Sequence, residues 1–213
     1  MQVSLYKWEV LLIFFQDSNK QKTMKKQRCD WPGKDPLYLT YHDEEWGTPV
    51  YDDKKLFEFL LLETFQAGLS WITILRKREN FRKAFDDFDY KKIANYTEEK
   101  IASLLQDAGI IRNKLKVNSA VTNAQAFMKI QKEFGSFKNY IWGFVDGKPI
   151  KNGFKSMSEI PANTPLSDTI SKNLKKRGFK FVGSTVVYAH MQATGMVNDH
   201  LESCFRYNEV NAN

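Results

Sequence analysis

Both cysteines of this 213-residue chain stand near a histidine, and the two pairs lie toward opposite ends of the sequence. The early pair is Cys29 and His42, and the late pair is His200 and Cys204. Two thiolates and two imidazoles form a ligand set typical of four-coordinate structural zinc. Residues four apart share one face of a helix, so we expect the late pair to lie on a helix and to bind one ion together. The quartet predicts a metal site that joins the two ends of a domain.

The same four residues allow a simpler interpretation. Cys29 and Cys204 could form a disulfide, or they could be unrelated buried thiols with core histidines nearby in sequence. A disulfide requires an oxidising compartment, and the chain has no convincing secretory signal, because Glu9 interrupts the N-terminal apolar region and a polar, basic stretch follows it. The long gap between the pairs fits no short zinc-finger pattern. Spacing alone therefore leaves both interpretations open.

A carboxylate stands inside the most apolar stretch of the chain. Residues 56–65 predict a buried helix because apolar residues occupy nearly every side, yet Glu63 lies among them. A buried carboxylate is costly unless it is hydrogen-bonded or protonated, so it indicates a buried polar partner or a ligand. Aromatic walls around one carboxylate would suit a flat, hydrogen-bonding ligand such as a nucleobase, although most aromatic residues simply belong to the core. Four aromatic residues lie close together near the early metal pair: Trp31, Tyr38, Tyr41 and Trp46.

Helical periodicity accounts for most of the chain, and we expect an all-α fold. Strand-like alternation is nearly absent outside residues 180–187, and no internal repeat or long linker divides the sequence. The expected helices cover 54–65, ending at Gly68; a segment from Trp71 capped by Ser70; 97–106 capped by Thr97; 113–134; a segment capped by Ser167 and reaching about Arg177; 185–194; and a last helix capped by Asn198 that carries His200 and Cys204.

Two of these helices are joined by a short turn that carries positive charge. The turn contains Gly109 and Ile110, and Arg112, Lys114 and Lys116 follow at the start of the next helix. Backbone amides at a helix N-terminus suit a phosphate, so the pattern is typical of a helix-hairpin-helix that binds the DNA backbone without reading bases. An ordinary helical hairpin with a solvated basic face is the alternative. The same two interpretations apply to a second basic cluster, formed by Lys172, Lys175, Lys176, Arg177 and Lys180.

The composition is that of a globular protein with an ample core, since 42% of the residues are hydrophobic and 14% are aromatic. The apolar run at residues 11–15 is too short to span a membrane. The net charge is +7, to which residues 1–27 contribute five lysines and two acidic residues, so the remainder carries only +4. That balance is weak support for a polyanionic partner. We expect residues 1–27 to be a non-catalytic extension, 28–207 the functional domain and 208–213 a tail, in a cytoplasmic monomer without membrane contact.

Seven sequence blocks, in the correct order, resemble the DNA-3-methyladenine glycosylase I family. The resemblance runs from about residue 28 to 207, and residues 1–27 lie outside it. Several blocks in order are far more specific than any single motif. The blocks are Arg28–Trp31, Asp35–Tyr38, Tyr41–Gly47, Gln66–Trp71, Gln106–Arg112, Lys175–Gly183 and Asn198–His200.

The resemblance implies an all-helical fold of the helix-hairpin-helix DNA glycosylase superfamily, with two helical lobes. It implies one structural zinc ion per chain at the Cys/His quartet, joining the N- and C-terminal segments. It also implies that Glu63 is the catalytic residue and hydrogen-bonds a flipped base between Tyr41 and Trp71. Trp31, Tyr38 and Trp46 would complete the walls. The expected DNA contacts are Gly68 and Leu69, which would fill the vacated base stack, and Gly109, Ile110, Arg112, Lys114, Lys175, Lys176 and Arg177.

The implied reaction is hydrolysis of the N-glycosidic bond of 3-methyladenine in double-stranded DNA, which releases the base and leaves an abasic site. Methylation at N3 gives the purine a positive charge and makes it a good leaving group. Related glycosylases commonly use an aspartate after the hairpin, and none stands at an equivalent place between Asn113 and Phe137, which favours modest catalysis on unstable bases. We expect no Schiff-base lysine and no strand cleavage, and we interpret His190 as structural.

Two other functions fit parts of the pattern. A DNA-binding module that has lost catalysis would keep the hairpin and the basic clusters. A zinc hydrolase of another substrate would keep the quartet, although four protein ligands leave no open position for water. The motifs of zinc deaminases are absent from the sequence.

Overall fold

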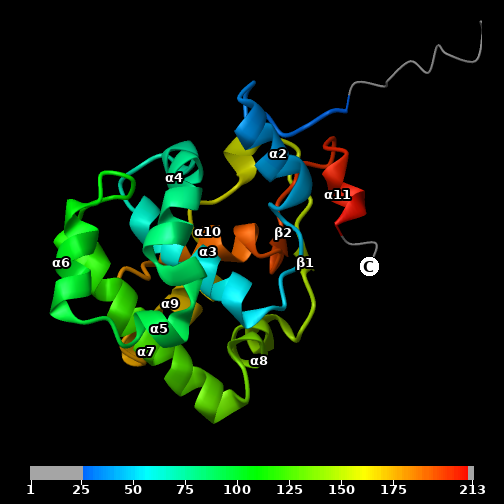
Figure 1. The fold of residues 1–213 in the computed structure, drawn as a ribbon. Coiled ribbons are helices and arrows are strands. Elements are labelled where there is room, and N and C mark those ends of the chain that lie inside the picture. Colours follow the sequence, from blue (N-terminus) through cyan, green and yellow to red (C-terminus); the bar gives the residue numbers. More distant parts are fainter. Residues whose placement is uncertain (1–25, 211–213) are drawn as a thin grey trace, which may run out of the picture.

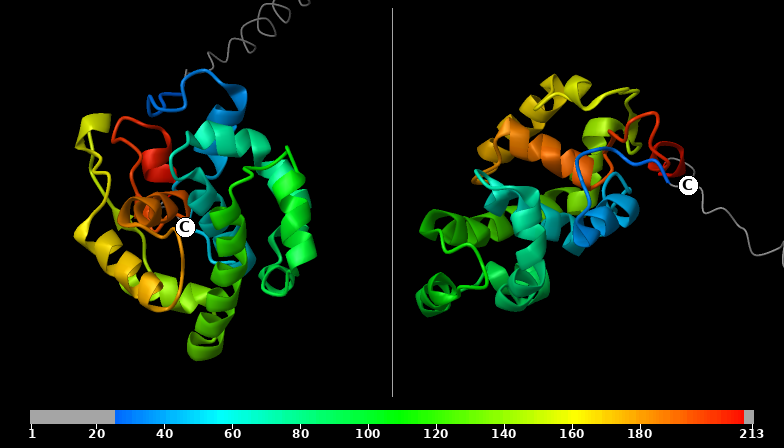
Figure 2. Two further views of the ribbon diagram at one scale, coloured as in Figure 1. Left: turned by 90° about the vertical axis from the view of Figure 1, so that its left-hand side faces the viewer. Right: turned by 90° about the horizontal axis from the view of Figure 1, so that it is seen from above.

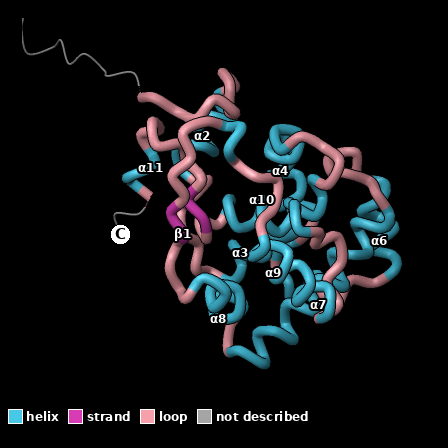
Figure 3. Tube along the Cα trace, turned by 180° about the vertical axis from the view of Figure 1, so that it is seen from behind, coloured by secondary structure: helices cyan, strands magenta, loops and turns pink. Residues whose placement is uncertain are grey.

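The computed structural model describes residues 26–210, so most of the expected N-terminal extension lies outside the described residues. The expectation of a mostly helical chain is confirmed (Figure 3). The all-α prediction needs one correction, because Ile150–Lys151 (β1) and Val197–Asn198 (β2) pair as two short parallel strands. The α-helices are α2 (Pro36–Glu44), α3 (Asp53–Gln66), α4 (Trp71–Ala84), α5 (Tyr90–Ile93), α6 (Glu98–Gln106), α7 (Lys114–Phe134), α8 (Phe137–Trp142), α9 (Pro165–Lys176), α10 (Ser184–Ala193) and α11 (Arg206–Glu209).

Helix caps agree with the sequence at some positions and differ at others. Thr97 caps α6 as expected, since its side chain accepts a hydrogen bond from the Lys100 amide. The expected cap of α9 at Ser167 is wrong. Thr164 is the cap, and Ser167 is the third helical residue, whose hydroxyl accepts from the Thr164 amide in a reciprocal capping box. Pro165 explains the earlier start, because proline is favoured in the first helical turn.

The predicted helix over the late metal pair is also wrong. His200 and Cys204 lie in an irregular segment between β2 and α11, and α11 begins only at Arg206. Asn198 belongs to β2, and its side-chain oxygen accepts the backbone N–H of His200, two residues later. That local hydrogen bond satisfies the His200 N–H within a turn, and such turns compete with helix formation. The two ligands are therefore brought together by a turn rather than by a helix face.

The helix α3 lies at the centre of the molecule. It packs against α4, α7, α8 and α10, and every residue from Leu56 to Phe65 is buried. In both views of Figure 2 the helices α4–α7 gather on one side, and α9 and α10 lie on the other. Any polar group on the second half of α3 is consequently held in the interior, between these two groups of helices. Within residues 26–210, none of the helices has the length and apolar character to cross a membrane.

The two ends of the described chain lie side by side, as the blue and red segments show (Figure 1). The Phe205 amide donates to the Gln27 carbonyl at 2.9 Å, and Arg206 donates to the Thr48 hydroxyl at 2.8 Å. Gly195 closes the same region, since a Cβ atom there would come within 2.5 Å of the Pro49 nitrogen. These contacts hold residues that are far apart in sequence against each other. The four residues of the Cys/His quartet lie in this region.

A buried lysine joins the hairpin to the core helix. Lys116 is only 6% exposed, and its ammonium donates to the carbonyls of Phe65 at 2.8 Å and Ala67 at 2.7 Å. These carbonyls belong to the C-terminal end of α3, where a positive charge is favourable. Lys116 therefore does not face solvent as part of the basic surface that the sequence predicted. It fixes the start of α7 against the end of α3.

Replacing this buried lysine should destabilise the protein and leave the charged residues on its surface unchanged. Lys116→Met leaves two carbonyls without their donor, and we expect a loss of about 2 to 4 kcal/mol in the free energy of unfolding. Denaturant unfolding measures the difference. Lys114→Met is the matched control, because Lys114 is exposed on the same helical turn and should change stability by less than about 0.5 kcal/mol. Equal effects of the two substitutions would contradict this role of Lys116.

Candidate active site and metal centre

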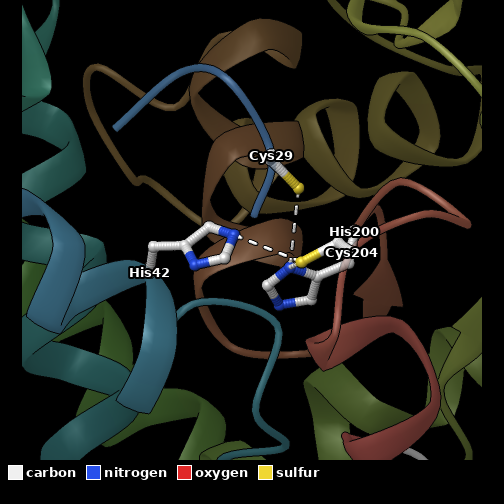
Figure 4. Close-up of side chains that lie close together, drawn as sticks. All are labelled: Cys29, His42, His200 and Cys204. Carbon is white, nitrogen blue, oxygen red and sulfur yellow. Dashed lines mark hydrogen bonds between the residues drawn. The ribbon is translucent and has the colours of Figure 1, made fainter. Parts of the chain in front are cut away.

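The four residues of the Cys/His quartet come together at the seam between the chain ends (Figure 4). All four are buried, and their donor atoms lie within 4.8 Å of one another. The Cys204 sulfur is 3.5 Å from His42 Nε2 and 3.6 Å from His200 Nδ1, and the Cys29 sulfur is 3.7 Å from His200 Nδ1. Both cysteines are free thiols, so the disulfide alternative is wrong. This group could bind a metal ion.

The second nitrogen of each imidazole is held by another group. His42 Nδ1 lies 2.8 Å from the Asp43 carboxylate, which also accepts from Arg28 at 2.7 Å. His200 Nε2 lies 3.0 Å from the Trp46 carbonyl. Because a carboxylate and a carbonyl can only accept, these nitrogens carry the protons, and the other nitrogen of each ring presents a lone pair to the thiols.

A cavity of about 340 Å³ opens beside this quartet. It contains the predicted carboxylate and all five of the predicted aromatic residues, so the structure brings these six side chains together. The remaining lining residues were not singled out from the sequence. The full lining is Trp31, Tyr38, Tyr41, Trp46, Glu63, Gln66, Trp71, Met157, Ile160, Pro161, Ala162, Thr185, Tyr188, Ala189 and Gln192.

One wall that the sequence analysis missed is formed by residues at helical spacing. Thr185, Tyr188, Ala189 and Gln192 lie at helical spacings of three and four on α10, so they share one face. The sequence indicated a buried helix there, but nothing in it identified which buried face borders a cavity. The segment 157–162 offered no comparable signal, since it is mainly a turn with a short 3-10 helix.

The aromatic wall is in direct contact with the metal-ligand group. The Trp31 ring packs edge-on against His42, with centroids 5.3 Å apart, and the Trp46 ring packs against His200 at 4.7 Å. Trp31 also contacts Tyr38 at 4.8 Å. The same two tryptophans thus touch the quartet on one side and line the cavity on the other. Fixing the quartet fixes the cavity wall.

Glu63 is the only ionisable carboxyl group among the residues that line the cavity. Its side chain is 3% exposed, and burial raises its pKa from the usual 4.5 to about 8. Its Oε2 atom and the indole N–H groups of Trp31 and Trp71 are buried without a hydrogen-bond partner. Buried polar atoms are normally paired, so these groups are suited to a ligand that supplies the missing partners. The rings of Tyr41 and Trp71 stand 5.4 Å apart beside them.

The opposite wall is held by a buried carboxylate. Asp199 is fully buried and accepts hydrogen bonds from the Tyr188 hydroxyl at 2.7 Å and from the Gln192 amide at 2.8 Å. Asn152 donates a third bond at 2.7 Å. Asp199 directly precedes the ligand-type residue His200, so one short segment supports both the metal-ligand group and the α10 wall of the cavity.

The loop after α3 borders the mouth of the cavity. Gln66 and Trp71 line the cavity on either side of this loop, and Ala67 to Ser70 are exposed. Gly68 has φ +83°, which favours glycine, and Leu69 is 41% exposed although it is apolar. The two residues expected to fill a vacated DNA stack are therefore found at the rim of the cavity, on the surface.

The helices α6 and α7 flank the segment predicted to form a hairpin, and they pack against each other. Arg112 and Lys114 are exposed in it, whereas Ile110 is buried. The Gly109 amide donates to the Asp107 carboxylate at 2.7 Å, and Lys77 donates to the Gly109 carbonyl at 3.1 Å. Hydrogen bonds with Asp107 and Lys77 thus hold the turn, and its charged side chains Arg112 and Lys114 are exposed to solvent.

The second basic cluster is divided by its contacts. Lys175 and Lys176 are exposed at the end of α9, but Arg177 forms a two-pronged ion pair with Glu133, at 2.6 and 3.0 Å. The structure therefore leaves the two lysines facing solvent and ties the arginine to α7.

His190, the third histidine, does not line the cavity. Its ring nitrogens are buried without partners, and burial lowers its pKa to about 4.

Comparison with known proteins identifies close relatives. The model of the methyladenine glycosylase family matches residues 31–207. A curated relative, DNA-3-methyladenine glycosylase 1 of Escherichia coli (strain K12), is 50% identical over 85% of this chain and 97% of its own length. A crystal structure of 3-methyladenine DNA glycosylase I is 52% identical, with a TM-score of 0.82 over 84% of this chain and 98% of that one. The Staphylococcus aureus enzyme, whose structure concerns 3-methyladenine recognition, is 39% identical, with a TM-score of 0.81 over 84% and 95%.

The raised pKa of Glu63 predicts how the free energy of unfolding changes with pH. The folded state holds the proton more tightly than the unfolded state, so wild-type stability should fall as pH rises from about 4.5 to about 8 and then level off. Glu63→Gln removes this ionisation, and above pH 8 it should be more stable than wild type by up to roughly 5 kcal/mol. The difference should shrink toward pH 4.5. Denaturant unfolding across this range tests it, and a variant less stable than wild type at pH 9 would show that the carboxylate has a stabilising partner.

Proposed function

The chain belongs to the methyladenine glycosylase family, and we infer that it is a DNA-3-methyladenine glycosylase: it hydrolyses the N-glycosidic bond of 3-methyladenine in alkylated DNA, as the names of its relatives indicate. The products are the free base and an abasic site. The structural observation that carries this conclusion is the aromatic cavity with one buried, unpaired carboxyl group at Glu63. A flat base that brings hydrogen-bond donors and positive charge supplies what this cavity lacks.

Base binding follows from the charge of the alkylated purine. The lesion must leave the stack to be reached, and unstacking costs less for a damaged base. Tyr41 and Trp71 offer electron-rich ring faces to a cation, an attraction on the order of 1 to 2 kcal/mol when desolvated. Glu63 is protonated in the free enzyme at neutral pH. An arriving cation favours the ionised form, so base binding should lower the pKa of Glu63 and release its proton.

Bond cleavage places modest demands on the protein. The cationic purine is already a good leaving group, and positive charge develops on the sugar as the bond breaks. The carboxylate that forms when the cationic base displaces the Glu63 proton would stabilise that charge. We assign Glu63 this electrostatic role together with base recognition. We assign no lyase step, because the Lys116 ammonium is occupied by two carbonyls and Lys114 lies on the exposed face of α7.

We propose that duplex DNA is bound by the α6–α7 turn acting as a helix-hairpin-helix. The exposed Arg112 and Lys114 would meet phosphates, and Lys175 and Lys176 would add charge from α9. Gly68 and Leu69 would enter the space that the flipped base leaves. The hydrogen bonds of Lys116 support this arrangement, because they link the hairpin directly to the loop at the cavity mouth.

We propose that the Cys/His quartet holds one structural zinc ion. A tetrahedral ion with ordinary Zn–S and Zn–N bonds separates sulfur from nitrogen by about 3.5 Å, and three of the four sulfur–nitrogen distances here are 3.5, 3.6 and 3.7 Å. Gly47 also fits, since a Cβ atom there would lie 2.9 Å from His200 Nε2. With four protein ligands the ion would crosslink Cys29 and His42 to the C-terminal segment, and the chemistry stays with Glu63.

The first test is base release. Wild-type protein incubated with methylated duplex DNA should liberate free 3-methyladenine without strand cleavage. Glu63→Gln should keep the fold and lose on the order of 100-fold or more in excision rate, because it removes the carboxylate that would stabilise the developing positive charge. Chromatography of released base measures both. DNA binding without release by wild type would instead support the module that has lost catalysis, and unchanged excision by the variant would remove Glu63 from the mechanism.

The second test concerns the metal. Elemental analysis of purified protein should find about one zinc per chain. Chelation should lower Tm and abolish activity together, since the ion contributes folding energy. Cys204→Ser should lose zinc and stability in the same way, while Glu63→Gln should retain both. Loss of activity after brief chelation with unchanged Tm would point to catalytic zinc, and protein purified without zinc but fully stable would refute the site.

A further inference from the structure

Phe181 adopts a backbone conformation that bulky residues rarely accept. It has φ +57°, in the left-handed region, and its side chain is 37% exposed. The same loop uses glycine at Gly178, where φ is +97°. At 181 the chain carries a phenylalanine in a place where glycine would be easier. A strained, exposed aromatic residue that is not there to fill the core indicates a role for the ring on the surface.

The residues on either side of Phe181 are firmly anchored. Asn123 of α7 binds the Lys180 backbone twice, accepting from its amide at 2.7 Å and donating to its carbonyl at 3.1 Å. Ser171 of α9 donates to the Val182 carbonyl at 2.6 Å, and Val182 is fully buried. Two helices thus hold the backbone on both sides of Phe181, which is itself partly exposed to solvent.

This position is close in sequence to one wall of the base cavity. Phe181 lies three residues before α10, and Thr185 in the first turn of α10 is both exposed and part of the cavity lining. α10 packs against α3, whose last residue, Gln66, also lines the cavity and leads into the loop of Leu69. Two different loops therefore leave the same cavity, and each carries one exposed apolar side chain. Lys180, the residue directly before Phe181, is also exposed.

We propose that Phe181 is a DNA-contacting residue that stacks on a base of the duplex at the cavity mouth, on the α10 side, while the lesion occupies the cavity. The proposal rests on the function proposed above. Flipping one nucleotide exposes the faces of its neighbours, and an aromatic ring can stack on any base because every base has a π-face. The anchored loop holds the ring in place before DNA arrives, so little side-chain freedom is lost on binding.

The decisive variant is Phe181→Gly, because glycine accepts a positive φ. If the ring acts on DNA, this variant should have an equal or higher Tm than wild type and a kcat/KM on methylated duplex about 10-fold lower, in line with the stacking contribution of one ring. Binding of free 3-methyladenine, measured by fluorescence titration of the cavity tryptophans, should be unchanged. Phe181→Trp should restore most of the activity, since it restores an aromatic face.

Two controls separate stacking from other causes. Phe134→Ala removes a ring of similar exposure, 38%, at the far end of α7, and should leave excision unchanged. The dependence of DNA affinity on salt should be equal in Phe181→Gly and wild type, because no phosphate contact is removed. A steeper or shallower salt dependence would mean that the loop acts through its lysines, and the stacking proposal would fall.

Several results would overturn the proposal directly. Wild-type excision by Phe181→Gly would do so, as would a loss of activity that only follows a loss of Tm. Failure of the wild-type protein to release base is a different outcome and rejects the proposed function. Affinity for a duplex with an abasic-site analogue then still tests the DNA contact: equal affinity of wild type and Phe181→Gly rejects it, and about 10-fold weaker binding by the variant supports it.

Discussion

The site depends on one carboxyl group that is buried without a hydrogen-bond partner. Glu63 sits on α3, which is covered on several sides by other helices, and its carboxyl group belongs to the lining of the aromatic cavity. Its desolvation appears as a pKa near 8. Such a group is costly in the free protein. A ligand that pairs with the carboxylate would remove this cost, and in the proposed function that gain in free energy would contribute to base recognition.

A carboxyl group of this kind needs walls that do not collapse onto it. One wall is the cluster of Trp31 and Trp46, whose rings contact the imidazoles of the Cys/His quartet. The other is α10, held by the hydrogen bonds of Asp199. Asp199 and His200 are neighbours in sequence. The short segment after β2 therefore contacts both walls of the cavity. The proposed zinc ion would therefore act on the cavity at a distance, by fixing the segment from which both walls are positioned.

Much of this arrangement could be predicted from residue types. A carboxylate in an apolar helix and two cysteines with two histidines are rare combinations, and both proved to lie in the interior at the expected places. The turn that carries His200 and Cys204 could not be foreseen, because spacing of four fits a helix equally well and the deciding hydrogen bond comes from Asn198. The burial of Lys116 was equally hidden. Its partners are backbone carbonyls of α3, and backbone groups leave no mark in a sequence.

The same physics gives the proposed cavity a way to distinguish damaged from normal bases. A neutral adenine that entered would bring no positive charge, so it would favour the ionised form of Glu63 less than a cationic purine does. Leaving a buried polar group without its partner costs about 1 to 3 kcal/mol, and more for a charge. A cationic purine avoids that penalty and gains the attraction of the carboxylate and the aromatic faces. Under the proposed function, charge at Glu63 would add to the selectivity that shape provides. A site without strong acid catalysis would also leave neutral bases in place, because an unprotonated normal purine is a poor leaving group.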